Sequence, residues 1–130
     1  MLTKQQMLSA LDGLIAEAER LHAVFLTDLL PWSPDFAVWL KASESTVEAI
    51  FGSGSAAFSS FRNIYFVPPP GQQSANDIER RKGEMTWFDS GLRFAHVTLI
   101  GYRYSVANAW QPRSLAAALP TSSFRTVVQR

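Results

Sequence analysis

Apolar residues recur at the three- and four-residue spacing of a helix face in two long stretches of the 130-residue chain. The first stretch contains Met7, Leu11, Leu14, Ala18, Leu21 and Phe25. The second contains Phe88, Leu92, Ala95, Leu99, Tyr102, Val106 and Trp110. A stripe of this length is typical of a long amphipathic helix that buries one face. The pattern therefore predicts a mainly α fold, a small helical bundle with a long N-terminal helix.

Residues that favour helix ends occur where the predicted helices should begin and end. Thr3 and Gln6 have the spacing of a capping box at the start of the first stripe. Ser33 followed by Pro34 is typical of an N-cap with proline in the first helical turn, and Gly52 suits the end of that second helix. The sequence thus predicts two successive helices before residue 53.

Four further segments qualify this picture. A break near Ser43–Ser45 is an alternative within the second helix, because a second capping-box spacing follows it. Residues 62–67, RNIYFV, favour a short strand, and residues 68–76, rich in Pro, Gly, Gln and Ser, predict a surface loop. A charged helix is expected to begin at Asp77–Lys82.

The stretch from Trp87 to Trp110 also admits a second interpretation. Its strand-forming residues, which include Val97 and Ile100, and a turn at Asp89–Gly91 would suit a C-terminal hairpin in an α+β fold. We favour the helix because seven apolar positions agree over 23 residues, a longer-range agreement than local strand propensity. We expect one helical domain over residues 1–111 and a C-terminal tail over residues 112–130.

Composition narrows the classes of protein and site. The chain has no cysteine, which excludes disulfides and cysteine-ligated metal clusters, and its two histidines argue against a histidine-rich metal site. The N-terminal residues MLTKQQ lack the pattern of a secretory signal, and no apolar run reaches the ~18 residues of a membrane span. We therefore expect a cytoplasmic protein without a membrane partner, a metal or a cofactor.

Charge is divided unevenly along the chain, although the net charge is only +1. Residues 1–60 have three basic and seven acidic side chains, a net charge of −4, whereas residues 61–130 have nine basic and four acidic ones, a net charge of +5. This asymmetry suits either an anion-binding second half or attraction between the two halves in the folded chain. Nucleic-acid-binding domains usually have a much larger basic excess, so we do not expect a nucleic-acid partner.

A polar stripe accompanies the apolar one in the second stretch and forms the candidate binding edge. Its members are Asp89, Arg93, His96 and Arg103. Arginine binds phosphate through two parallel hydrogen bonds, and aromatic rings stack on nucleic-acid bases. Residues of these two types extend the candidate site to Arg62, Tyr65, Tyr102 and Trp110. The combination predicts a site for a nucleotide or another small anionic signal.

No motif in the sequence specifies catalysis. Asp77–Lys82 lacks the strand-borne acid and Glu-x-Lys spacing of metal-dependent nucleases and is typical of a solvated helix. Gly52–Ser55 lacks the lysine and the spacing of a phosphate-binding P-loop. His22 follows the first apolar stripe, where a hydrogen-bonded structural role is expected, whereas His96 belongs to the candidate binding edge. We predict no catalytic residue.

Part of the chain resembles a known family. The segments FAVWLKASESTVEAIFGSGSAAFSSFRNIYF and FDSGLRFAHVTLIGY, separated by a proline-rich loop, are similar to a short helical module of bacterial anti-phage defence proteins, where it usually precedes an effector domain. The similarity covers residues 36–102, and its shared positions are mostly apolar residues or glycine. The resemblance implies a helical fold and an accessory or sensing role, without identifying a ligand.

These observations favour a non-enzymatic protein-interaction or accessory module in a bacterial or phage defence or counter-defence system. A nucleotide- or signal-binding protein that uses the arginine and aromatic edge is the alternative. The C-terminal tail has three arginines, no acidic residue and few apolar ones, so it cannot bury a core of its own. We expect the tail to dock within a homodimer, with Phe124 as its anchor.

Overall fold

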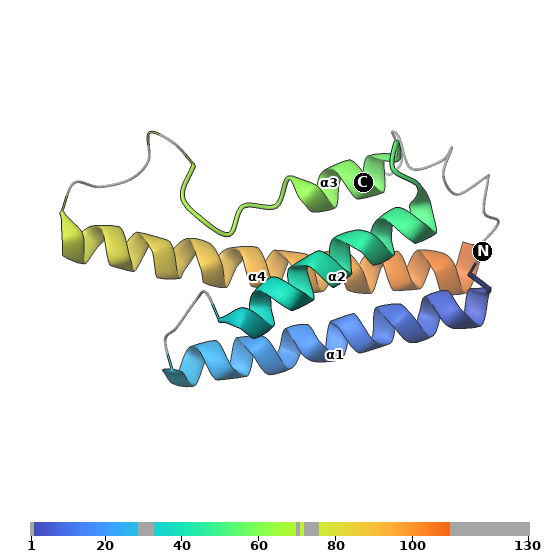
Figure 1. Ribbon diagram of the computed structural model, residues 1–130, viewed down its shortest axis with the longest axis horizontal. Coiled ribbons are helices and arrows are strands. Elements are labelled where there is room, and N and C mark those ends of the chain that lie inside the picture. Colours follow the sequence, from blue (N-terminus) through green and yellow to red (C-terminus); the bar gives the residue numbers. More distant parts are fainter. Residues whose placement is uncertain (1, 29–32, 70, 72–75, 110–130) are drawn as a thin grey trace.

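The computed structural model describes residues 2–28, 33–69, 71 and 76–109, and these residues form helices and no strand (Figure 1). The helices are α1 (Lys4–Asp28), α2 (Pro34–Phe51), α3 (Ala56–Arg62) and α4 (Asp77–Ala109). α1 packs along α4 and also contacts α2, and α2 contacts α3. The predicted mainly α bundle with a long first helix is confirmed within this part of the chain.

Capping side chains fix the starts of all four helices in the described residues, and Ser55 is the cap of α3. The Thr3 hydroxyl accepts a hydrogen bond from the backbone N–H of Gln6 at 3.1 Å, and the Gln6 side-chain oxygen accepts one from Thr3 N–H at 2.9 Å. Ser33 Oγ accepts a hydrogen bond from Phe36 N–H at 3.2 Å. Asn76 Oδ1 caps α4 by accepting from two backbone N–H groups, at 2.9 and 3.0 Å. The caps predicted at Thr3 and Ser33 are therefore confirmed.

α2 runs without interruption from Pro34 to Phe51, so the alternative of a break near Ser43–Ser45 is wrong. Val47 and Ile50 continue the buried face beyond that point, and this burial keeps the chain in one helix. Gly52 caps the C-terminal end of α2, and its φ of 99° lies in the left-handed region that favours glycine.

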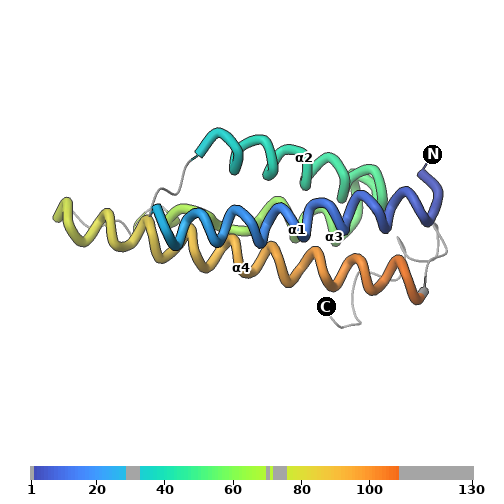
Figure 2. The backbone as a smooth tube through the Cα atoms, turned by 90° about the horizontal axis from the view of Figure 1, so that it is seen from below, coloured from blue at the N-terminus to red at the C-terminus, as the bar shows by residue number. Residues whose placement is uncertain are grey.

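α4 joins two segments that the sequence treats separately. The charged segment Asp77–Lys82 and the stretch that begins at Trp87 form one continuous helix, so the alternative C-terminal hairpin is wrong. The helix buries Phe88, Leu92, Ala95, Leu99 and Val106. A hairpin would divide this face between two strands, whereas the helix buries all of it together. The first turns of α4 extend past the end of α1 (Figure 2).

Residues 62–67 do not form the predicted short strand. α3 ends at Arg62, and the residues that follow have no neighbouring strand with which to pair in the described part of the chain. Ile64 and Phe66 pack against the helical core instead. Phe66 is buried, and the ring centroid of Tyr65 lies 6.1 Å from that of Trp87.

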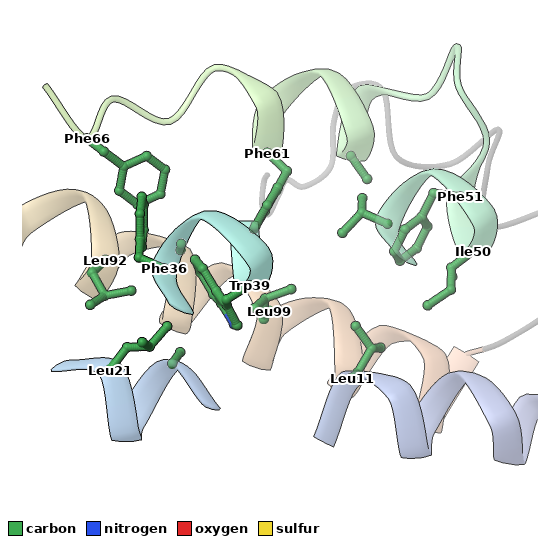
Figure 3. Close-up of a cluster of buried hydrophobic side chains, with 14 of the residues drawn as sticks. Leu11, Leu21, Phe36, Trp39, Ile50, Phe51, Phe61, Phe66, Leu92 and Leu99 are labelled. Carbon is green, nitrogen blue, oxygen red and sulfur yellow. The ribbon is translucent and has the colours of Figure 1, made fainter. Parts of the chain in front are cut away.

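The core forms where α1, α2 and α4 meet, with α3 on one side (Figure 3). Its side chains include Leu11, Leu21, Trp39, Phe61, Leu92 and Leu99. The indole N–H of Trp39 donates to the carbonyl oxygen of Leu14 at 2.9 Å, so this ring is buried with its donor satisfied. Among the predicted stripe residues that the structure describes, Leu14 and Tyr102 are only partly buried.

Phe88 is the centre of an aromatic cluster that joins three parts of the chain to α4. Its ring centroid lies 4.9 Å from that of Phe25, 4.8 Å from that of Phe36 and 6.5 Å from that of Phe66. The rings are tilted or edge-to-face, which are favourable geometries for aromatic pairs. α1, α2 and the segment after α3 are thus held against one side chain of α4.

The two longest helices are antiparallel, and the end of α4 lies near the start of α1 (Figure 1). The predicted tail, residues 112–130 with Phe124, lies outside the described residues, and so does Trp110. Among the described helices, none combines the length and the apolar character that crossing a membrane requires.

Candidate functional site

The predicted polar stripe of α4 faces α1. Asp89, His96 and Arg103 are seven residues apart and therefore share one edge of α4. In that order, they meet His22, Glu19 and Asp12 of α1. The reversed order of these partners is what two antiparallel helices require. We call these six residues the α1–α4 polar row.

His22 and Asp89 make the most enclosed contact of the α1–α4 polar row. His22 Nε2 lies 2.6 Å from Asp89 Oδ1, and the two side chains are 24% and 27% exposed. Because a carboxylate can only accept, His22 Nε2–H donates this hydrogen bond. Arg93 Nε lies 3.2 Å from Asp89 Oδ2 and 3.5 Å from the same His22 nitrogen. A protonated Nε2 cannot accept a hydrogen bond, so the partner of Arg93 is Asp89.

The other two contacts of the α1–α4 polar row are more exposed. Arg103 Nε donates to Asp12 Oδ1 at 2.5 Å, and this hydrogen bond raises the pKa of Arg103 above its ordinary value. His96 Nε2 lies 3.4 Å from Glu19 Oε2 without hydrogen-bond geometry, and this buried nitrogen has no other partner among the described residues. The row therefore aligns α1 with α4, while exposed pairs of this kind add little to stability.

The other described candidate residues, Arg62, Tyr65 and Tyr102, lie outside the α1–α4 polar row. The guanidinium of Arg62, at the end of α3, stands 5.5 Å from the ring centroid of Phe58. The hydroxyl of Tyr102 donates to the carbonyl oxygen of Ala57 at 2.8 Å, which ties α4 to α3. Tyr65 is exposed on the segment that follows α3.

The described members of the predicted anion site do not converge on one point. Arg93 and Arg103 are engaged by Asp89 and Asp12, so an anion at this edge would compete with two carboxylates. Arg62 belongs to a different helix and contacts an aromatic ring. The binding role of these residues stays a prediction. In residues 2–28, 33–69, 71 and 76–109, no three acidic or histidine side chains are placed to hold a metal ion.

The outer face of α4 has a row of large apolar side chains in contact with solvent. It consists of Phe94, Val97, Ile100 and Tyr104, which are between 44% and 69% exposed, and we call it the outer stripe. α4 lies at the edge of the bundle, on the side away from α2 (Figure 2). Single exposed apolar residues are normal, whereas a contiguous row on one helix face is typical of an interaction surface.

Sequence reasoning based on one amphipathic face overlooks the outer stripe. Val97, Ile100 and Tyr104 are among the strand-forming residues that favour the hairpin interpretation. The available signal is a second set of apolar positions at helical spacing, displaced by two residues from the core stripe. Two residues correspond to about 200° of rotation around a helix, so the two sets occupy opposite faces. A helix that is apolar on two faces has a second surface to cover.

No family model, no curated protein and no solved structure matches this chain. The fold and the surface therefore define its class. Within the described residues, the protein is a small helical bundle whose candidate ionisable residues mainly join its helices. Its longest helix has an apolar outer face.

Proposed function

We propose that this chain is a non-enzymatic protein-interaction module that binds its partner through the outer stripe of α4. The observation that carries the proposal is the exposure of four large apolar side chains along one helix face. Apolar surface that leaves water on binding contributes roughly 25 cal/mol per Å². A protein that covers the outer stripe gains this contribution, whereas a small polar ligand does not.

The composition of the outer stripe supports a protein partner. Phe94 and Tyr104 are large aromatic residues, a type that is enriched at the centres of protein interfaces. Arg93 borders the stripe with a 63% exposed side chain, and arginine is enriched in the same regions. The charged groups of the α1–α4 polar row, by contrast, form contacts between two helices of the same chain.

The resemblance of residues 36–102 to helical modules of bacterial anti-phage defence proteins supports an accessory role in such a system. Phe94, Val97 and Ile100 lie within the segment that carries this resemblance. In this proposal, the module recognises another protein and has no catalytic step of its own.

The proposal is tested by Val97→Glu in the full chain, isolated with an affinity tag from its native host. Recovery of the bound partner should fall at least ~10-fold, because burying an unpaired carboxylate costs more than the ~1.4 kcal/mol to which that factor corresponds. Quantitative mass spectrometry of the isolated complexes measures this recovery.

Val38→Glu is the matched control, because Val38 is 71% exposed on α2 and Val97 is 63% exposed on α4. Both variants should keep the helical circular dichroism spectrum of the isolated chain. Val38→Glu should also keep the partner. Equal recovery of the same proteins with both variants would contradict the proposal.

A further inference from the structure

Three residues of the outer stripe belong to a longer exposed row on α4, whose regular spacing bears on the identity of the partner. Exposed residues follow each other there at alternating steps of four and three, namely Ser90, Phe94, Val97, Gly101, Tyr104 and Asn108. Ile100 borders this row. Alternating steps of four and three are the spacing at which one helix packs along another. From Ser90 to Asn108, the row offers a second helix about 27 Å of contact.

The row is complementary to a reversed copy of itself. When Ser90 is set opposite Asn108 of the partner subunit, Phe94 lies opposite the partner's Tyr104. In the same register, Val97 lies opposite the partner's Gly101. A twofold axis repeats each of these pairs, as in any dimer with identical surfaces in contact. Two aromatic pairs and two valine–glycine pairs result, with polar residues at both ends.

The sizes of these side chains favour the antiparallel arrangement over the parallel one. A Cβ atom added to Gly101 would have no other atom within 4 Å, so the surface is open at this position. In the antiparallel register, Val97 of the partner subunit fills the space above Gly101. In a parallel pair, two glycines would face each other and leave a gap in the middle of the contact, which close-packed interfaces avoid.

The distribution of charge around the exposed row is also compatible with binding of a second copy of the chain. From Phe94 to Asn108, the row itself has no acidic or basic side chain. Arg93 is at its border and pairs with Asp89 at 3.2 Å. In the antiparallel register it is level with the partner's Ser105, which has no charge. Arg103 donates to Asp12 of its own chain. Like charges are therefore not set against each other across the twofold axis.

We propose that the outer stripe is a dimerisation surface, on which a second copy of this chain binds with its α4 antiparallel to the first. This inference rests on the proposed function and names the partner of the same surface. Two observations support this inference. The exposed row has heptad spacing, and each of its side chains is complementary in size to the residue opposite it in the antiparallel register.

Engineered disulfides test both the dimer and its direction, because the natural sequence has no cysteine. Ile100→Cys places the two thiols next to the twofold axis. At about 10 micromolar protein, this variant should form a covalent dimer on the order of 100-fold faster than Val38→Cys, because a dimer holds its thiols at a millimolar effective concentration. An equimolar mixture of Phe94→Cys and Tyr104→Cys should cross-link faster than either variant alone. Light scattering on the unmodified full chain should give twice the mass of one 14.5 kDa chain.

Three results would overturn the inference. They are a single-chain mass at every concentration, equal cross-linking of Ile100→Cys and Val38→Cys, and self-linking of Phe94→Cys that exceeds its linking to Tyr104→Cys. The last result indicates a parallel pair. If the chain is a monomer while Val97→Glu still loses a host protein, the proposed function stands and the second-copy inference fails. If Val97→Glu leaves every interaction intact, both fail.

Discussion

Leu99→Ala should lower the free energy of unfolding by about 2–5 kcal/mol, which is the usual range for deleting a buried leucine side chain. Leu99 is 0% exposed and lies beside Trp39 in the core between the long helices (Figure 3). Three packed helices cannot move together far enough to close the cavity that remains. Urea unfolding followed by far-UV circular dichroism measures the loss. The protein concentration is kept fixed, because binding to a partner changes apparent stability.

Ile78→Ala is the matched control for this prediction. Ile78 belongs to the same helix and has a similar side-chain volume, but it is 70% exposed. Its replacement should change the free energy of unfolding by no more than about 0.5 kcal/mol. Similar losses in the two variants would mean that the buried face of α4 is assigned wrongly.

Gly91→Ala should lower the free energy of unfolding by about 1–3 kcal/mol, the usual cost of forcing an extra group into a packed site. A Cβ atom at this position of α4 would collide with the carbonyl oxygen of Tyr65 and lie 2.8 Å from Cδ1 of Phe66. The first of these atoms belongs to the backbone and cannot turn away. The segment after α3 would have to lift, and Phe66 would leave the aromatic cluster around Phe88.

Gly13→Ala should have the opposite sign and raise the free energy of unfolding by about 0.4–1 kcal/mol. Gly13 is exposed in α1, and an added Cβ atom would have nothing within 4 Å. Alanine there reduces the freedom of the unfolded chain and favours the helix. If Gly91→Ala is also stabilising under the same urea titration, the close approach of residues 65 and 66 to α4 is refuted.

The helices were predictable where apolar spacing and capping residues agree. Thr3, Ser33 and Gly52 mark the expected helix ends, and the core stripes set the buried faces. Residues 62–67 were mispredicted, because strand propensity reports how well aromatic and β-branched residues pack on a half-buried surface. Here Phe66 finds such a surface on helices. That contact depends on residues distant in sequence and has no local signal.

The sequence predicts that the candidate binding edge lies along one side of a helix, but it does not predict that this edge contacts α1. Asp89, His96 and Arg103 follow one another at helical spacing, which the sequence shows directly. Their partners on α1 are more than 60 residues earlier in the chain, and only the antiparallel packing of α1 on α4 brings the two sets together. The outer stripe could not be predicted for another reason. Its residues favour strands in isolation, and only a continuous helix places them on one face.

The most direct test of the central claim is the accessibility of position 97 in the native host. Val97→Cys and Val38→Cys each give the chain a single thiol, and both valines are exposed on the surface of a single chain. A thiol-reactive reagent is applied to intact cells, and its rates are compared with those of the same proteins unfolded in guanidinium. We expect Val97→Cys to react several-fold more slowly than Val38→Cys in the cell and equally fast when unfolded, because a bound protein covers the outer stripe. Equal rates in the cell would show an uncovered stripe and would contradict the account.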